Sequence, residues 1–159
     1  MKIWVLRHGE AQAQAATDAE RELTHHGRMQ VQAQARRWGA HMAPTHIWVS
    51  PFVRAQQTAA VWSDALITLP DVTPATVDWL MPEAAVSQVV DQLSLCDEGS
   101  EILLVSHQPL VSELVAYFTG EAAWACSMGT AYLAELTLPL AARGLADHHA
   151  IHAPNLSEL

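Results

Sequence analysis

The sequence of 159 residues has few charged side chains, only two cysteines and no long hydrophobic run. Charged residues make up 16% of the chain and hydrophobic residues 50%, which excludes a disordered protein. The apolar stretches fall far short of the ~20 residues that a membrane-spanning helix needs. No basic segment followed by an apolar stretch opens the sequence, as a secretory signal would.

The two cysteines, Cys96 and Cys126, lie far apart in the sequence, without the spacing of a zinc site or a disulfide framework. A chain of this length buries roughly 70% of the surface that it exposes when unfolded, so one core needs no cross-links. We therefore expect a reduced, cytosolic, globular protein, with a single domain that spans residues 1–159.

Positive charge is also scarce. Eight Lys and Arg residues stand against 17 Asp and Glu residues, which gives a formal net charge of −9. Such a surface repels nucleic acid and anionic lipid, so we expect neither nucleic acid nor a membrane as a partner. Lys2 is the only lysine, and the seven other cations are arginines, whose forked guanidinium groups suit phosphate or carboxylate. Codon usage explains the same bias, so composition alone leaves an anion site open.

Short apolar runs alternate with longer helix-like stretches. Runs 2–6, 46–50 and 101–106 are typical of strands buried on both faces of a parallel sheet. Weaker strand candidates are 76–80, 130–138 and 147–152, the last at a sheet edge. Helices are predicted over about 26–41, 52–65, 84–95 and 110–118. This alternation predicts βα units and an α/β sandwich.

Two helix starts carry capping signals. Thr24 precedes the first predicted helix, and Ser50 stands before a proline that suits the first position of the second helix. We therefore expect both residues to be N-caps.

Charged and polar side chains follow the predicted strands. Arg7 and His8 lie at the end of the 2–6 strand, and Arg54 comes soon after the 46–50 strand. Glu83 follows the weaker candidate at 76–80, and His107 follows the 101–106 strand. Sites in open α/β sheets form beyond the carboxyl ends of the strands, so these side chains are expected at one edge.

Two histidines and two arginines at one edge suit a phosphoryl group. A neutral imidazole such as that of His8 can attack phosphorus, while Arg7, Arg54 and His107 donate hydrogen bonds to the charged oxygens. Each residue taken alone is more typical of an ordinary satisfied polar group at a strand end. Two unpaired arginines at one edge would repel each other, however, and a bound anion would relieve that repulsion.

Four blocks of sequence carry a family resemblance. They are VLRHGE at 5–10, LTHHG at 23–27, VSPFVRAQQT at 49–58 and LVSHQPLV at 104–111. In this order they resemble the histidine phosphatase superfamily, also called the phosphoglycerate mutase-like family. RHGEA, SPF-x-RA-x-QT and the small size are most similar to the short phosphohistidine phosphatases of the SixA type.

The resemblance implies a three-layer α/β/α sandwich with a mostly parallel central sheet and a covalent phosphohistidine intermediate. It implies that His8 is the nucleophile, that Arg7 and Arg54 bind phosphate, and that His107 binds phosphate and stabilises the transition state. It implies no metal and no other cofactor. The implied substrate is a phosphorylated protein histidine, such as that of a histidine phosphotransfer domain, and the oligomeric state stays open.

Glu83 is the point at which the chain departs from the family pattern. Larger members carry an acid that protonates the leaving oxygen, and Glu83 is the nearest candidate, outside that family's usual block. The alternative is a carboxylate in the first turn of a helix, favoured by the helix dipole. A missing acid favours phosphohistidine as substrate over small phosphate esters, because an imidazole can be protonated before it leaves. A module that binds phosphohistidine without turnover is a further alternative.

Other polar residues attract attention without a defined role. Asp18 lies in the loop after His8, either at the mouth of the pocket or simply in solvent, and Arg21 has no role that the sequence supports. His148, His149 and His152 cluster near the end of the chain, where only an adventitious metal site is expected.

Overall fold

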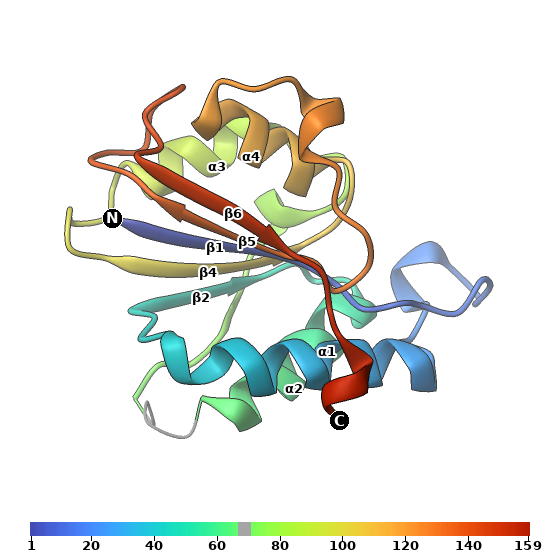
Figure 1. Cartoon of the computed structure of the whole chain (residues 1–159). Coiled ribbons are helices and arrows are strands. Elements are labelled where there is room, and N and C mark those ends of the chain that lie inside the picture. Colours follow the sequence, from blue (N-terminus) through green and yellow to red (C-terminus); the bar gives the residue numbers. More distant parts are fainter. Residues whose placement is uncertain (67–70) are drawn as a thin grey trace.

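A six-stranded sheet forms the centre of the molecule (Figure 1), in a computed structural model that describes residues 1–66 and 71–159. The strands are β1 (Lys2–Arg7), β2 (His46–Val49), β3 (Ala75–Thr76), β4 (Glu101–Ser106), β5 (Leu133–Thr137) and β6 (His148–His152). Their order is β3-β2-β4-β1-β5-β6. The first four of these are mutually parallel, whereas β5 runs antiparallel to both β1 and β6. The predicted sheet, including β6 at an edge, is confirmed.

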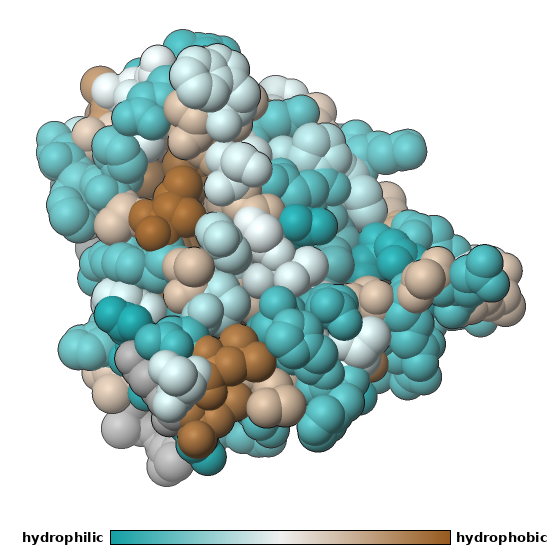
Figure 2. All heavy atoms as spheres, turned by 45° about the vertical axis from the view of Figure 1, so that its right-hand side comes forward, coloured by the Kyte–Doolittle hydropathy of each residue, from teal (hydrophilic) through white to brown (hydrophobic). Residues whose placement is uncertain are grey.

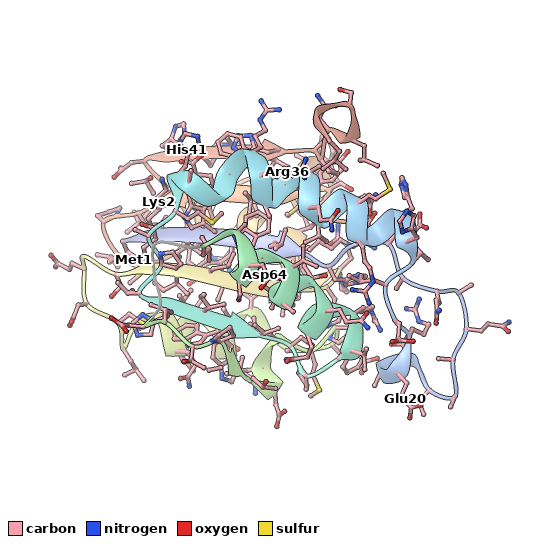
Figure 3. The ribbon with its side chains drawn as sticks, turned by 90° about the horizontal axis from the view of Figure 1, so that it is seen from below. Met1, Lys2, Glu20, Arg36, His41 and Asp64 are labelled. Carbon is pink, nitrogen blue, oxygen red and sulfur yellow. The ribbon has the colours of Figure 1, made fainter. Side chains whose placement is uncertain are left out.

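Four α-helices cover the two faces of the sheet (Figure 1). They are α1 (His25–Trp38) and α2 (Val53–Ala65) on one face and α3 (Val86–Leu93) and α4 (Leu110–Thr119) on the other. Figure 3 shows α1 and α2 side by side against their face of the sheet. Short 3₁₀ helices are η1 (Asp18–Glu20), η2 (Gly39–His41), η3 (Asp78–Leu80), η4 (Ala123–Cys126) and η5 (Leu156–Glu158). The expected three-layer α/β/α sandwich is confirmed. In the described part of the chain, no helix is long and apolar enough to span a membrane.

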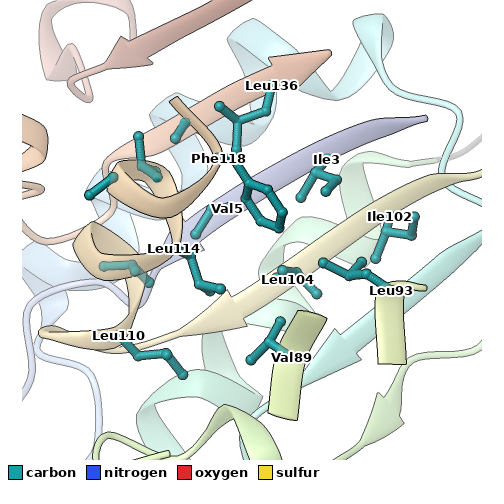
Figure 4. Packing of buried hydrophobic residues seen from close by; sticks show 14 of the residues in the cluster. Ile3, Val5, Val89, Leu93, Ile102, Leu104, Leu110, Leu114, Phe118 and Leu136 are labelled. Carbon is teal, nitrogen blue, oxygen red and sulfur yellow. The ribbon is translucent and has the colours of Figure 1, made fainter. Parts of the chain in front are cut away.

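The central strands are buried on both faces, as their continuous apolar runs indicated. Residues 3–6 and 102–105 have no exposed surface. Because side chains alternate along a strand, Ile3 and Val5 pack under α3 and α4 (Figure 4), while Trp4 and Leu6 pack against α1 and α2. The strands at the centre of the sheet therefore have no solvated side, and polar groups concentrate where the strands end.

The predicted strand at 76–80 is wrong over most of its length. Only Ala75 and Thr76 pair with β2, and the chain then turns into η3. The turn buries Leu80 completely and sets the Trp79 ring edge-on to that of Trp48, with ring centroids 5.0 Å apart. Burial of these apolar groups thus ends the strand.

The second helix begins later than its capping signal indicated. Thr24 is the N-cap of α1 as predicted, since its hydroxyl accepts a hydrogen bond from the Gly27 amide at 2.9 Å. Ser50 is not the N-cap of α2, because that position falls to Phe52 and the helix starts at Val53. The Ser50 hydroxyl instead accepts from the Phe52 amide at 3.3 Å and contacts a histidine of another strand exit.

Two glycines let the segment after β1 lie directly against the start of α1. A Cβ atom on Gly9 would lie 2.5 Å from the Gly27 carbonyl oxygen, and one on Gly27 would overlap the backbone of Glu10. Only glycine permits this approach, which fixes the path of the chain immediately beyond His8.

A core substitution tests the packing under α4. Leu114 has no exposed surface, so Leu114→Ala should lower the free energy of unfolding by about 2–5 kcal/mol in urea denaturation. Leu95→Ala is the matched control, since Leu95 is 80% exposed and its truncation should change the value by less than about 0.5 kcal/mol. Equal effects of the two substitutions would contradict this placement of α4.

Candidate active site

The parallel pairing of β1 with β4 brings two histidines together beyond the carboxyl ends of these strands. Arg7 lies opposite Ser106 in the ladder, so His8 and His107 leave the sheet at the same level. The His8 amide donates to the Ser106 carbonyl at 3.1 Å, and the two imidazole centroids are 5.1 Å apart. His8 is 6% and His107 1% exposed. In Figure 1 these strand ends point toward the loop that contains η1.

The contacts of His8 fix which of its ring nitrogens carries the proton. Nδ1 lies 2.6 Å from the Gly9 carbonyl oxygen, which can only accept, so Nδ1 holds the proton. Nε2 accepts a hydrogen bond of 3.2 Å from Arg54 Nε, which can only donate. Burial and the positive charges of Arg54 and Arg7 together lower the pKa of His8 to about 4, against the hydrogen bond to Gly9, which raises it. At neutral pH His8 is therefore uncharged, with the lone pair of Nε2 facing the arginine.

His107 is held by the segment that follows β2. Its Nε2 lies 2.6 Å from the Ser50 hydroxyl, and Phe52 packs its ring edge-on against the imidazole. Nδ1 is buried and has no hydrogen-bond partner within the described residues. Burial, with repulsion from His8 and Arg54, lowers the pKa of His107 to about 2. A second neutral imidazole thus lies beside His8 with one ring nitrogen unoccupied.

Arg54 is fixed by a carboxylate from the loop after β1. It extends from the first turn of α2 and is 4% exposed. Its Nη1 donates to the Asp18 carbonyl at 2.7 Å and its Nη2 to Asp18 Oδ2 at 3.2 Å, which leaves Nε for His8. Arg21 Nε donates to the other oxygen of Asp18 at 2.8 Å. These arginines hold the pKa of Asp18 below its usual value, so its carboxylate stays charged.

Arg7 is a second, half-buried cation at this edge. Its Nη1 donates to the Met128 carbonyl at 2.9 Å, and Gln108 donates to the same oxygen at 3.0 Å. Its Nε is buried without a partner in residues 1–66 and 71–159. Burial and the charge of Arg54 both lower the pKa of Arg7. Two arginines kept close despite this cost favour an anion between them, because a buried charge needs a partner.

Glu83 lies outside this cluster. It is exposed and occupies a turn before α3, which begins only at Val86, so the alternative of a carboxylate in the first helical turn is wrong. In the described structure it forms no hydrogen bond to any residue of the four-residue cluster, which consists of Arg7, His8, Arg54 and His107. It does line a cleft of about 580 Å³ that Asp18 and Phe52 also line, so its carboxylate lies on a wall next to the cluster.

Sequence reasoning missed several supporting residues. Asp18 lies at the mouth of the site, which is one of the two positions expected for it. Its pairing with Arg54 was not predicted, and neither was its ion pair with Arg21. Thr58 is fully buried, accepts from the Gly9 amide at 3.2 Å and donates to the Arg54 carbonyl at 2.8 Å. Only Thr58 carried a usable signal, because it ends the block that contains Arg54.

Two of the three histidines near the end of the chain have carboxylate partners. His149 lies 3.3 Å from a carboxylate oxygen of Glu121, and His152 lies 3.4 Å from one of Glu135 and stacks on Trp38. Within the described residues, no group of three or more His, Cys, Asp or Glu side chains could hold a metal ion.

Comparison with known proteins shows the family of the chain. The family model of the histidine phosphatase superfamily (branch 1) matches residues 3–83. The chain belongs to the histidine phosphatase superfamily. A phosphohistidine phosphatase SixA homolog of Haemophilus influenzae is 35% identical over 129 residues, covering 76% of this chain and 79% of the relative. Phosphohistidine phosphatase SixA of Escherichia coli K12 is 37% identical over 120 residues, covering 73% of each chain.

Solved structures of the superfamily share the fold over nearly the whole chain. The protein histidine phosphatase SixA complexed with tungstate superposes with a TM-score of 0.83 at 31% identity, covering 99% of each chain. A phosphoserine phosphatase of Entamoeba histolytica superposes with a TM-score of 0.66 at 16% identity, covering 93% of this chain and 95% of the other. The second match shows the fold alone.

The protonation of the paired histidines can be tested by NMR. In the folded protein, ¹⁵N-labelled His8 and His107 should stay neutral from pH 7 down to pH 5, with the proton of His8 on Nδ1. In urea the same residues should titrate near their model value of 6.5. Between the folded-state pKa of His8, about 4, and the model value of 6.5, the unfolded chain binds more protons than the folded chain. The free energy of unfolding should therefore fall as the pH drops below about 6.5. A folded-state midpoint above about 6 for His8 would contradict the buried, neutral geometry.

Proposed function

We propose that the chain is a phosphohistidine phosphatase that works through a covalent phosphate on His8. The observation that carries the proposal is the unprotonated Nε2 of His8, buried, neutral and accepting a hydrogen bond from Arg54. A nucleophile at phosphorus needs an unprotonated lone pair, and the developing charge needs fixed donors around it. The two SixA relatives and the tungstate-bound SixA structure support the same activity, since tungstate is an oxyanion like phosphate.

In the first step the Nε2 lone pair of His8 attacks phosphorus, in line with the bond to the substrate imidazole. The P–N bond of the substrate breaks, and its electron pair returns to that imidazole, which leaves neutral because its other nitrogen has taken a proton from solvent beforehand. Arg7 and Arg54 hold the oxygens of the transferring group, and the free Nδ1 of His107 is placed to donate to them.

The Ser50 hydroxyl sets the proton of His107 for this role. It accepts from the Phe52 amide, so its own proton is available for His107 Nε2, and the imidazole proton then resides on Nδ1. In this arrangement a neutral His107 donates to a phosphoryl oxygen without adding a charge to the two arginines.

In the second step water attacks the phosphorus of phospho-His8. The new P–O bond replaces the P–Nε2 bond, whose electron pair returns to His8, and the water proton passes to the departing phosphate or to solvent. Nδ1 keeps its proton on the Gly9 carbonyl throughout, so the enzyme returns to its starting state.

The substrate we propose is a protein that carries phosphohistidine, for instance a histidine phosphotransfer domain. A phosphorylated imidazole needs no strong general acid to leave. This fits the position of Glu83, which in the described structure forms no hydrogen bond to the four-residue cluster. The second candidate is a phosphatase of small esters. One observation favours it: Glu83 lines the cleft beside the cluster, from which it could protonate a leaving alcohol.

Removal of the nucleophile tests the covalent mechanism. His8→Ala should lower turnover of a phosphohistidine protein by at least about 10³-fold and abolish the acid-labile ³²P label on the enzyme after a rapid quench. His26→Ala is the matched control, because His26 is exposed at the start of α1. Full activity of His8→Ala would refute the mechanism, and phosphate binding without turnover of phosphohistidine by the wild type would favour the binding module.

Substitution of Glu83 separates the two candidate substrates. On a phosphohistidine protein, Glu83→Gln should change kcat by less than about threefold, because the leaving imidazole is protonated beforehand. A simple aryl phosphate should be the poorer substrate of the wild type. An ester rate that exceeds the phosphohistidine rate and falls about 100-fold in Glu83→Gln would instead establish the ester phosphatase.

A further inference from the structure

The aromatic ring of Phe52 borders both the cluster of Arg7, His8, Arg54 and His107 and the cleft next to it. Phe52 contacts both sides, because its ring lies edge-on to His107 with centroids 5.0 Å apart, and the same residue lines the cleft. The guanidinium carbon of Arg54 lies 5.0 Å from the centre of this ring. A group bound in the cleft would therefore be an immediate neighbour of a phosphoryl group bound at His8.

Part of the lining of the cleft is apolar. It consists of Phe52, Trp79 and Met81, and we call it the floor. The Trp79 ring is fixed by the edge-on contact with Trp48 of β2, and Met81 is 36% exposed. Around this edge of the sheet, which is turned toward the viewer in Figure 2, the surface is mostly hydrophilic and hydrophobic residues form only small patches. An apolar floor here is thus a local feature.

The rim of the cleft is negative. Asp18, Asp78 and Glu83 line it, all three exposed, and no lining residue is a lysine, arginine or histidine. The charge of one of them, Asp18, is compensated by Arg54 and Arg21, so the negative charge offered to a ligand is that of Asp78 and Glu83. The surface next to the phosphoryl site thus carries the opposite charge to the site itself, and a second anionic group of a substrate would be repelled there.

We propose that this cleft binds a lysine or arginine side chain of the phosphoprotein, close to its phosphohistidine; the proposal rests on the function proposed above. Both side chains have long apolar stems that would lie on Met81 and the Trp79 ring while the charge reaches Asp78 and Glu83. The cleft thereby selects for a cation beside the phosphoryl group. Phosphorylated metabolites with a second anionic group, and nucleic acids, are selected against by the same carboxylates.

A matched peptide pair tests the charge requirement. Both peptides carry a non-hydrolysable phosphonate analogue of phosphohistidine, and they differ only in a neighbouring arginine or its neutral isostere citrulline. At low salt the arginine peptide should bind about three- to tenfold more tightly in fluorescence titrations, and the ratio should shrink at high salt. Equal dissociation constants for the two peptides at low salt would overturn the proposal.

Variants locate the effect in the cleft. Asp78→Asn should lower the arginine-to-citrulline ratio, and Met81→Lys should bring it to one or below, while both keep the thermal unfolding midpoint of the wild type because these residues are exposed. Asp64→Asn is the control, since Asp64 is an exposed carboxylate on α2, labelled in Figure 3, and should leave the ratio unchanged. A ratio that responds to Asp64 as much as to Asp78 would show general charge attraction and refute docking in the cleft.

Failure of the proposed function would be seen separately. Hydrolysis of phosphoramidate by the wild type measures the phosphatase itself and involves no neighbouring side chain of a partner. Turnover of phosphoramidate together with equal binding of the two peptides would reject the docking cleft and leave the phosphatase intact. Absence of turnover with a clear preference for the arginine peptide would reject the phosphatase and support the cleft.

Discussion

The register of β1 against β4 is the constraint on which the site depends. Because Arg7 lies opposite Ser106, the residues after the two strands emerge side by side, and the His8 amide completes the ladder at the Ser106 carbonyl. A shift of one strand by one residue would turn its side chains to the opposite face, so that those now under α3 and α4 would meet α1 and α2. The packing of the core therefore enforces the register, and the register places the two imidazoles. The packing that stabilises the fold thus also positions the two imidazoles of the site.

Burial does two opposite things to the polar groups at this edge. It keeps His8 and His107 neutral, which leaves Nε2 of His8 unprotonated, and it makes the charges of Arg7 and Arg54 costly. Asp18 compensates Arg54 from the solvent side, whereas among the described residues Arg7 donates to the Met128 carbonyl and has no carboxylate partner. The imbalance leaves net positive charge in front of a neutral nucleophile. An anion that arrives there meets donors already in place, so little reorganisation is required.

The sequence predicted the sheet, the four helices and the convergence of the four residues, since each follows from local patterns: apolar runs, strand exits and short motif blocks. It failed where tertiary contacts overrode a local signal. The 76–80 run reads as a strand, yet burial of Leu80 ends it at Thr76, and Ser50 reads as an N-cap, yet its hydroxyl contacts His107. The pairing of Asp18 with Arg54 spans 36 residues and has no periodic signature.

Net charge and site charge have opposite signs, and the geometry explains how both coexist. A total of −9 would repel a phosphoprotein at long range, but charges beyond about 10 Å are largely screened at physiological salt. At short range Arg7 and Arg54 face the phosphoryl group, and Asp78 and Glu83 of the cleft face whatever lies next to it. The substrate that satisfies both is a phosphoryl group with a cation beside it. The acidic surface thus favours a phosphoryl group with a neighbouring cation. An isolated dianion gains the attraction of the two arginines but no attraction from the carboxylates of the cleft.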